Sequence, residues 1–193
     1  ILAWITIEAT TLSTAFLISY YNKPSAMEAA WKYLIINSAG LLLGFFGTLL
    51  YFTSVKSGAG ALSISWDVLR DNAMFIDPVV AKVAFIFVLI GYGVKIGFFP
   101  MHTWKPDVYS KTPAPVGALL SSALLSVGFV ILLKFKSITD ITLGEGFTNQ
   151  LLMVFGTLSI AVAAFVVYAA KNYKRLLAYS SIEQAGVIAI GFS

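Results

Sequence analysis

Apolar runs of about twenty residues dominate this chain and constrain its fold more than any other feature. The hydrocarbon core of a bilayer is about 30 Å thick, and a helix needs about 20 mostly apolar residues to cross it. Five such runs can be read in the sequence, and a sixth is still apolar where it reaches Ser193. We therefore predict an all-α, polytopic integral membrane bundle with helices at about 1–21, 33–52, 79–99, 114–134, 150–170 and 175–193.

The composition excludes several classes of protein. Only 11% of the 193 residues are charged, compared with about a quarter in soluble domains. Cysteine is missing and His102 is the single histidine, which rules out cysteine-ligated iron–sulfur sites, Cys/His zinc sites and disulfides within these residues. The basic residues are scattered between apolar runs, which argues against nucleic acid as a partner. We expect no cofactor in this chain and any redox centre in partner subunits.

The first residue, Ile1, already lies inside an apolar run. No basic segment or small-residue cleavage site precedes that run, so the pattern does not resemble a cleaved signal peptide. We expect the sequence to be a piece of a longer polytopic protein.

Basic residues are unevenly divided between the two sides of the predicted bundle. One side carries Lys23, Lys32, Lys105, Lys111, Lys171, Lys174 and Arg175. The other side carries Lys56, Arg70, Lys134 and Lys136. The positive-inside rule makes the first side cytoplasmic.

The connection 53–78 contains the sequence SISWDVLRDNAM. Trp66, Leu69 and Ala73 fall on one side of a helix there, with Asp67 and Arg70 among its polar positions. This spacing fits a short interfacial helix, and an ordinary polar loop with an anchoring tryptophan fits it equally well.

Lys95 lies in the apolar segment GYGVKIGFFPMHTW, residues 91–104. Gly91, Gly93 and Gly97 surround it, and Pro100 cannot donate a hydrogen bond to the carbonyl of residue 96. A broken helix beside an ionisable group is typical of an ion site inside a membrane. We therefore predict a discontinuous helix near 95–105, with Gly97 and Pro100 at the break and Lys95 on a proton pathway.

Glu8 is the acid best placed to serve as a partner for Lys95. Hydroxyl residues follow it in the first apolar run, so that part of the run is expected to face the bundle interior. Opposite charges about 4 Å apart interact by roughly 4 kcal/mol at an effective dielectric constant near 20, enough to control whether the lysine holds a proton. The alternative is a carboxylate held by neighbouring hydroxyls for structure alone.

Three further ionisable residues are candidates for the same pathway. Lys82 lies about 20 Å from Lys95 along a helix axis. The alternative is a purely structural residue whose long side chain reaches the membrane surface. His102 could bring protons in near the cytoplasmic mouth, or cap a loop. Glu183 could pass protons onward, or be a neutral carboxyl satisfied by nearby Ser180, Ser181 and Gln184.

Two long segments resemble a known family. They are similar to the proton-conducting, antiporter-like membrane subunits of respiratory complex I, multisubunit Mrp-type cation/proton antiporters and membrane-bound hydrogenases. The two segments are GYGVKIGFFPMHTWKPDVYSKTPAPVGALLSSALLSVGFVILLKF and KNYKRLLAYSSIEQAG. With WITIEATTLSTAFLISYY and Glu183, the sequence most resembles the branch that contains the F component of hydrogenase-4. The resemblance covers nearly the whole chain and implies one transmembrane domain, 1–193, within a bundle of about fourteen helices.

The resemblance also implies site residues and partners. In the family, the residues matching Glu8 and Lys95 form a paired site that modulates proton transfer. Many relatives have a lysine where this chain has Ser126, or a histidine where it has Ser121, so the central relay here is expected to depend on hydroxyls and water. Nickel–iron and iron–sulfur centres are expected in partner subunits, in the cytoplasmic membrane of a prokaryote.

The expected function is proton translocation in a redox-driven complex of the hydrogenase-4, formate hydrogenlyase or NADH–quinone oxidoreductase type. Two alternatives remain open. The chain could belong to a multisubunit sodium/proton antiporter without a redox partner, or to a structural subunit that has lost conduction, as Ser121 and Ser126 would allow.

Overall fold

A computed structural model describes residues 2–55, 65–168 and 172–193, and these residues are almost entirely helical, without a strand. The α-helices are α1 (Leu2–Ile18), α2 (Pro24–Ser54), α3 (Trp66–Asp71), α4 (Pro78–Ile96), α5 (Trp104–Lys111), α6 (Ala114–Leu119), α7 (Leu125–Leu143), α8 (Gly146–Val167) and α9 (Tyr173–Gly191). Two 3-10 turns cover Ala73–Phe75 and Met101–Thr103, and a π-helical segment, Leu120–Leu124, joins α6 to α7. The predicted all-α bundle is confirmed.

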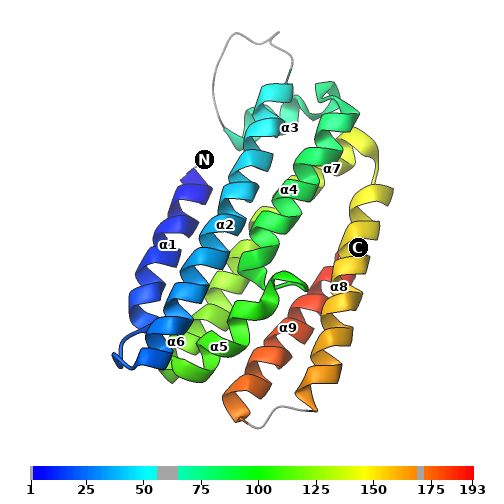
Figure 1. The fold of residues 1–193 in the computed structure, drawn as a ribbon. Helices are drawn as coiled ribbons and strands as arrows, with labels where there is room; N and C mark the ends of the chain where they lie inside the picture. Colours follow the sequence, from blue (N-terminus) through cyan, green and yellow to red (C-terminus); the bar gives the residue numbers. More distant parts are fainter. Residues whose placement is uncertain (1, 56–64, 169–171) are drawn as a thin grey trace.

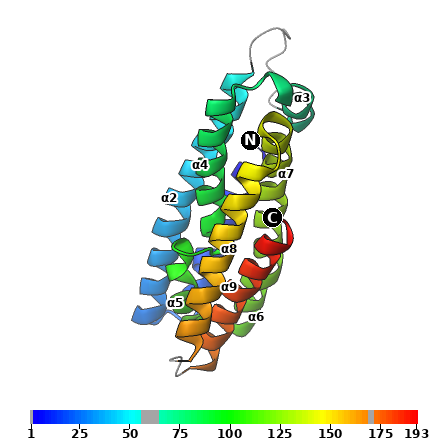
Figure 2. The ribbon, with the colours of Figure 1, turned by 90° about the vertical axis from the view of Figure 1, so that its right-hand side faces the viewer.

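The long helices lie side by side along one axis (Figure 1), with α1 at one edge and the α8–α9 pair at the other. α4 packs against α2 and α7, and α9 packs against α8 and α5. The α1–α2 connection and the beginning of α9 lie at the same end as α5, whereas α3 lies at the opposite end. A quarter turn away, Figure 2 shows α8 and α9 lying across the bundle from α2.

Within the part of the chain that the structure describes, four helical segments are long and apolar enough to cross a membrane: Pro24–Ser54, Pro78–Lys111, Ala114–Leu143 and Gly146–Val167. The outer faces of the bundle expose large apolar side chains, such as Phe16 (79% exposed) and Phe165 (82% exposed). Exposed apolar surface around a helical bundle is what a lipid environment stabilises.

Helix α2 extends well beyond its predicted range of 33–52. α2 begins at Pro24 instead of near residue 33, because proline is favourable in the first turn of a helix. A Glu28–Lys32 ion pair of 2.8 Å also supports this polar first part. Apolar content indicated only the part of the helix that lies in a membrane.

The segment after α2 contains the short helix α3, capped by the Ser65 side chain. Leu69 and Ala73 are buried and Trp66 is half-buried, as the helical alternative predicts. The helical alternative for this connection is therefore confirmed for residues 65–75. Lys56 and Lys171, which contributed to the predicted charge asymmetry, lie outside the described residues.

α4 stops in the middle of the bundle (Figure 1). Its last residue is Ile96, because Gly97 adopts the left-handed conformation with φ of 86°, which glycine accepts without strain. The chain then passes Pro100 and resumes helical structure in Met101–Thr103 and α5. The discontinuous helix near 95–105 is confirmed, but Gly97 ends α4 three residues before Pro100, so the proline is not what breaks it.

Side chains supply hydrogen bonds to the backbone at this break. The Trp104 indole N–H donates to the carbonyl oxygen of Val94 at 2.9 Å. The backbone N–H of Phe99 donates to the Ser159 hydroxyl at 3.0 Å. Irregular backbone at membrane depth requires such partners, so α5 and α8 stabilise the interruption of α4.

α2 and α4 approach closely at a pair of glycines, Gly44 and Gly91. A Cβ atom added to Gly91 would collide with the backbone of Gly44. Gly91→Ala is therefore expected to lower the free energy of unfolding by about 1–3 kcal/mol, because the helices must separate. Thermal unfolding of the purified full-length protein in detergent measures this. Gly146→Ala, whose Cβ meets nothing within 4 Å, serves as the control; equal losses in both variants would contradict the prediction.

Candidate functional site: a buried lysine at the helix break

Lys95 lies in the last turn of α4 and is only 3% exposed. Its Nζ donates hydrogen bonds to the Thr11 hydroxyl at 2.8 Å and to the Tyr33 hydroxyl at 2.7 Å. The amine also lies 5.0 Å from the centre of the Tyr33 ring. α1 and α2 thus provide the immediate surroundings of an amine that the bundle removes from solvent.

The hydroxyls around Lys95 continue into a network along α1. The Tyr33 hydroxyl lies 2.8 Å from the Thr14 hydroxyl, and Thr11 and Thr14 are both buried. The Tyr33 ring packs edge-on against Trp104, which holds the other side of the helix break. Hydroxyl groups can both donate and accept hydrogen bonds, so the network can carry a proton in either direction.

Glu8 lies one helical turn before Thr11 on α1. Its Oε1 accepts a hydrogen bond of 2.7 Å from the Ser38 hydroxyl, whereas Oε2 is buried without a hydrogen-bond partner among the described residues. The ion pairs found within 4 Å in the described part of the chain do not include Glu8 and Lys95. The predicted direct pairing is therefore not observed, because Thr11 and Tyr33 occupy the positions around the amine.

Tyr33, Asn37 and Ser38 of α2 belong to this site but were not singled out from the sequence. Asn37 is fully buried, and its amide group donates to the carbonyl oxygen of Tyr33 at 2.9 Å. The side-chain oxygen of Asn37 has no partner among the described residues. The signal that could have found them is the polar pair Asn37–Ser38 within an otherwise apolar run.

Removing the Tyr33 hydroxyl should destabilise the site. In Tyr33→Phe the Lys95 amine keeps only its bond to Thr11, and a hydrogen bond to a charged group is worth about 1.5–3 kcal/mol. We expect a loss of that size in the free energy of unfolding, measured by thermal unfolding in detergent. Tyr168→Phe, at a 98% exposed position, is the control. A variant as stable as the control would show that the hydroxyl does not hold the amine.

The structure does not bring Lys82 into this group. Lys82 is exposed on the surface of α4, and its amine lies 5.8 Å from the centre of the Phe147 ring. His102 is buried between the rings of Phe99 and Tyr179, and its Nδ1 has no hydrogen-bond partner among the described residues. The predicted roles of both residues in proton transfer remain predictions.

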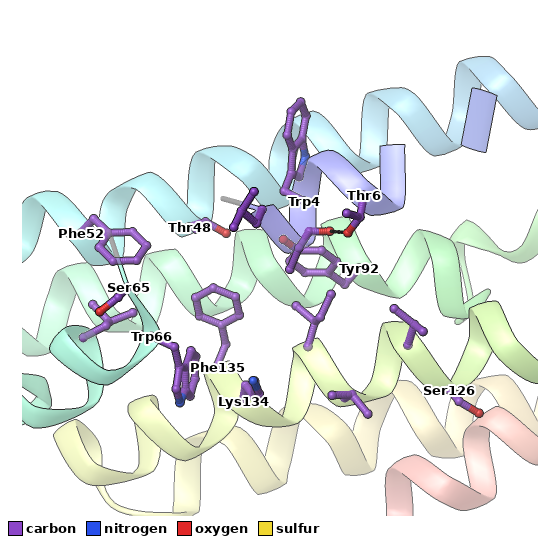
Figure 3. Close-up of a pocket in the computed structure, with 16 residues that line it drawn as sticks. Trp4, Thr6, Thr48, Phe52, Ser65, Trp66, Tyr92, Ser126, Lys134 and Phe135 are labelled. Carbon is purple, nitrogen blue, oxygen red and sulfur yellow. Dashed lines mark hydrogen bonds between the residues drawn. The ribbon is translucent and has the colours of Figure 1, made fainter. Parts of the chain in front are cut away.

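Ser121 and Ser126 border two different cavities. Ser126 lines a cavity of about 610 Å³ between α1, α2, α4 and α7. Trp66 and Lys134 line the same cavity, and Figure 3 shows Ser126 at some distance from both. Ser121 lines a second cavity of about 330 Å³ beside α9. Each hydroxyl donates to a carbonyl of its own helix, at 2.9 Å for Ser126 and 3.0 Å for Ser121. The two serines therefore form no continuous relay with each other.

Glu183 lies on the outer face of α9 and is exposed. Its neighbour Ser181 is instead buried and accepts a hydrogen bond of 3.2 Å from the Lys105 amine. Both predicted roles of Glu183, passing protons onward or being a neutral carboxyl satisfied by its neighbours, remain predictions.

Lys105 is fully buried, which corrects its predicted place among the basic residues of a surface loop. The reason is that α5 packs against both α9 and α2 after the break. Asp107 of the same helix does lie at the surface, where it pairs with Lys32 at 3.3 Å and Arg175 at 3.1 Å. These ion pairs join α2, α5 and α9 at this end.

Metal-binding geometry is not found in the part of the chain that the structure describes. Groups of three or more His, Cys, Asp or Glu residues close enough to hold an ion do not occur there. The chemistry that the described residues can perform is proton transfer between amine, hydroxyl and carboxylate groups.

Sequence comparison relates the whole chain to one family. The family model described as "NADH:quinone oxidoreductase/Mrp antiporter, TM" matches residues 1–193. The chain is 38% identical over 193 residues to the hydrogenase-4 component F homolog of Methylacidiphilum infernorum, covering 99% of this chain and 40% of that protein. It is 37% identical over 189 residues to NADH-quinone oxidoreductase subunit N of Chlorobium chlorochromatii, covering 92% of this chain and 36% of that protein. It thus spans less than half the length of these relatives.

Solved structures share the fold. A chain of the membrane-bound sulfane sulfur reductase, an archaeal respiratory membrane complex, superimposes with a TM-score of 0.88 at 27% identity, covering 98% of this chain and 38% of that one. A chain of respiratory complex I from Thermus thermophilus gives a TM-score of 0.79 at 26% identity, covering 98% of this chain and 39% of that one.

Proposed function

The chain belongs to the NADH:quinone oxidoreductase/Mrp antiporter transmembrane family, and from this we propose that it is the part of a redox-driven membrane complex that moves protons. It is a multi-pass membrane protein. The observation that carries the proposal is the buried Lys95 amine at the break in α4, held by hydroxyl groups of α1 and α2. Placing an ionisable amine inside a membrane costs free energy, and such a group at an interrupted helix is typical of an ion pathway.

The proposed mechanism uses Glu8 as a mobile counter-charge. Its carboxylate is held by Ser38 on one side, while Oε2 is buried and unpartnered one turn from Thr11. Movement of this carboxylate toward Lys95 would favour the protonated amine, and return to Ser38 would favour release of the proton. At about 4 Å and an effective dielectric constant of about 20 the interaction is roughly 4 kcal/mol, large enough to reverse the protonation state.

The released proton would leave through the hydroxyl network. The Tyr33 hydroxyl would accept it from Lys95 while giving its own proton to the Thr14 hydroxyl, and Thr14 would give its own proton to a water molecule beyond it. Each hydroxyl ends with the proton count with which it started. Moving a charge across a membrane potential of about 100 mV costs about 2.3 kcal/mol, which electron transfer in partner subunits must supply.

The partners we propose are the other subunits of a hydrogenase-4, formate hydrogenlyase or NADH–quinone oxidoreductase type complex. Both curated relatives carry names of such complexes. Nickel–iron and iron–sulfur centres would be held by those subunits, and the complex would lie in the cytoplasmic membrane of a prokaryote. The more basic end of the bundle, with Lys23 and Arg175, would face the cytoplasm.

Isolation of the full-length protein from its native membrane tests the proposal. We expect subunits with iron–sulfur or nickel centres to copurify, and the complex in vesicles to take up protons when its redox reaction runs. An uncoupler should abolish the uptake without stopping electron transfer. Redox turnover with no proton movement at all would overturn the proposal.

A sodium/proton antiporter subunit is the second candidate function, because the matching family description includes Mrp antiporters. In that case small membrane subunits should copurify instead of redox subunits. Proton movement should then require a sodium gradient and no electron donor.

A further inference from the structure

Lys105 is a second buried amine that the proposed mechanism does not use. It is 0% exposed, and its Nζ donates a hydrogen bond of 3.2 Å to the Ser181 hydroxyl on α9. Its side chain lies against Gly97, so that a Cβ atom at Gly97 would lie 2.9 Å from the Lys105 Nζ. The two buried lysines thus lie at the same interruption of the membrane helix.

The surroundings of Lys105 leave its charge without compensation. In residues 2–55, 65–168 and 172–193 no carboxylate lies within 4 Å of this amine. The ionisable groups nearest in sequence are His102 and Tyr109, one turn away on either side, and Asp107, which pairs with Lys32 and Arg175 at the surface. Burying an unpaired ammonium is costly, and a lysine can avoid that cost by releasing its proton.

A cavity borders Ser181, the residue that accepts the hydrogen bond from this amine, and reaches Lys174 near the basic end of the bundle. The cavity of about 330 Å³ is bordered by Ser181, Ser121 and Tyr109, and it extends to Lys174 and to Tyr173, which is 70% exposed. It is large enough for several water molecules.

Two hydroxyls at this cavity need a partner that the protein does not provide. The Tyr109 hydroxyl and the Thr112 hydroxyl are both buried without a hydrogen-bond partner among the described residues. Tyr109 is 7% exposed and Thr112 is 1% exposed. Buried polar groups of this kind are normally satisfied by ordered water, so water in the cavity would complete the hydrogen bonding of both hydroxyls.

We propose that Lys105 is a second proton-carrying residue, loaded from the basic end of the bundle through the cavity that Ser181, Ser121 and Tyr109 border. This proposal rests on the proposed function of the chain. When the Lys105 amine is neutral, its lone pair accepts the proton of the Ser181 hydroxyl, and a cavity water returns a proton to Ser181. That water is reprotonated from the solution at the basic end, so the only net change is one proton gained by Lys105.

The test uses the full-length protein in its intact complex, reconstituted in vesicles, with proton uptake and electron transfer measured together. Lys105→Met removes the amine, Lys105→Arg keeps a charge that cannot be released, and Ser181→Ala removes the relay hydroxyl. We expect each of the three to lower the number of protons taken up per electron by more than half. Lys111→Met on the same helix, which is exposed, and Ser110→Ala, which does not border the cavity, should match the wild type.

The outcomes separate this inference from the proposed function. Normal proton uptake in Lys105→Arg would overturn the inference, because a charge that cannot be released would then be sufficient for uptake. Normal proton uptake in Ser181→Ala would also overturn it, because uptake would then not need the relay hydroxyl. If Lys105→Met does not assemble, these two milder variants decide the question. Loss of uptake in Lys95→Met together with normal uptake in all Lys105 and Ser181 variants would overturn only the role of Lys105. Uptake that no variant changes, Lys95→Met included, would overturn both proposals.

Discussion

Lys95→Met is expected to stop proton translocation while electron transfer in the partner subunits continues. Methionine has a stem of similar length but no ionisable group, so the hydroxyls of Thr11 and Tyr33 lose the amine that donates to them. Side chains that transfer protons contribute roughly 10²–10⁴-fold to rates, so uptake should fall by about 100-fold, to background. The measurement is proton uptake by vesicles that contain the complex, with electron transfer followed in the same sample.

Two further variants make this result specific. Lys95→Arg should also be inactive, because an arginine keeps its proton under all conditions in a protein. Lys23→Met, which removes an exposed lysine before α2, should leave uptake unchanged. If Lys95→Met translocated protons normally, the chain would be a structural subunit without a role in conduction.

Gly97→Ala is expected to affect both stability and transport. The left-handed conformation of Gly97, with φ of 86°, costs any other residue about 1–2 kcal/mol. An alanine Cβ would also collide with the side chain of Lys105, and such overpacking costs about 1–3 kcal/mol. The free energy of unfolding should therefore fall by both amounts. Proton uptake should fall with it, because both buried lysines lie at this break.

A double-mutant cycle with Lys105→Ala separates the two causes. In the Lys105→Ala background an alanine Cβ at position 97 no longer meets the lysine side chain, so Gly97→Ala carries the backbone strain without that collision. Thermal unfolding in detergent should therefore show a smaller loss from Gly97→Ala in the Lys105→Ala background than in the wild type. Equal losses in the two backgrounds would show that Lys105 moves aside without cost.

The comparison between sequence and structure is clearest at Lys95. A charged residue deep in an apolar run, followed by glycine and proline, was sufficient to predict a broken helix and a buried amine. The immediate partners were not predictable in the same way. Glu8 was chosen because opposite charges attract, but the structure places Thr11 and Tyr33 around the amine and leaves Glu8 with Ser38.

Lys105 shows the opposite error. A lysine beside Pro106 and Asp107 is typical of a surface loop, and the side chain of Asp107 is indeed 32% exposed. Its burial depends on how α5 packs against α9, a helix far along the chain. Contacts of this kind join residues 76 positions apart and leave no local pattern.

The amino-acid sequence alone was enough to establish the membrane class, the helical bundle and the interruption of α4, because each depends on local hydrophobicity, helix geometry or the chemistry of glycine. The tertiary structure decided which polar groups meet inside the bundle. Hydrogen bonds between Lys95 and two other helices, and between Lys105 and Ser181, depend on helix packing and rotation. Packing is set by the sum of many weak contacts over the whole bundle, so no single segment of the sequence can reveal it.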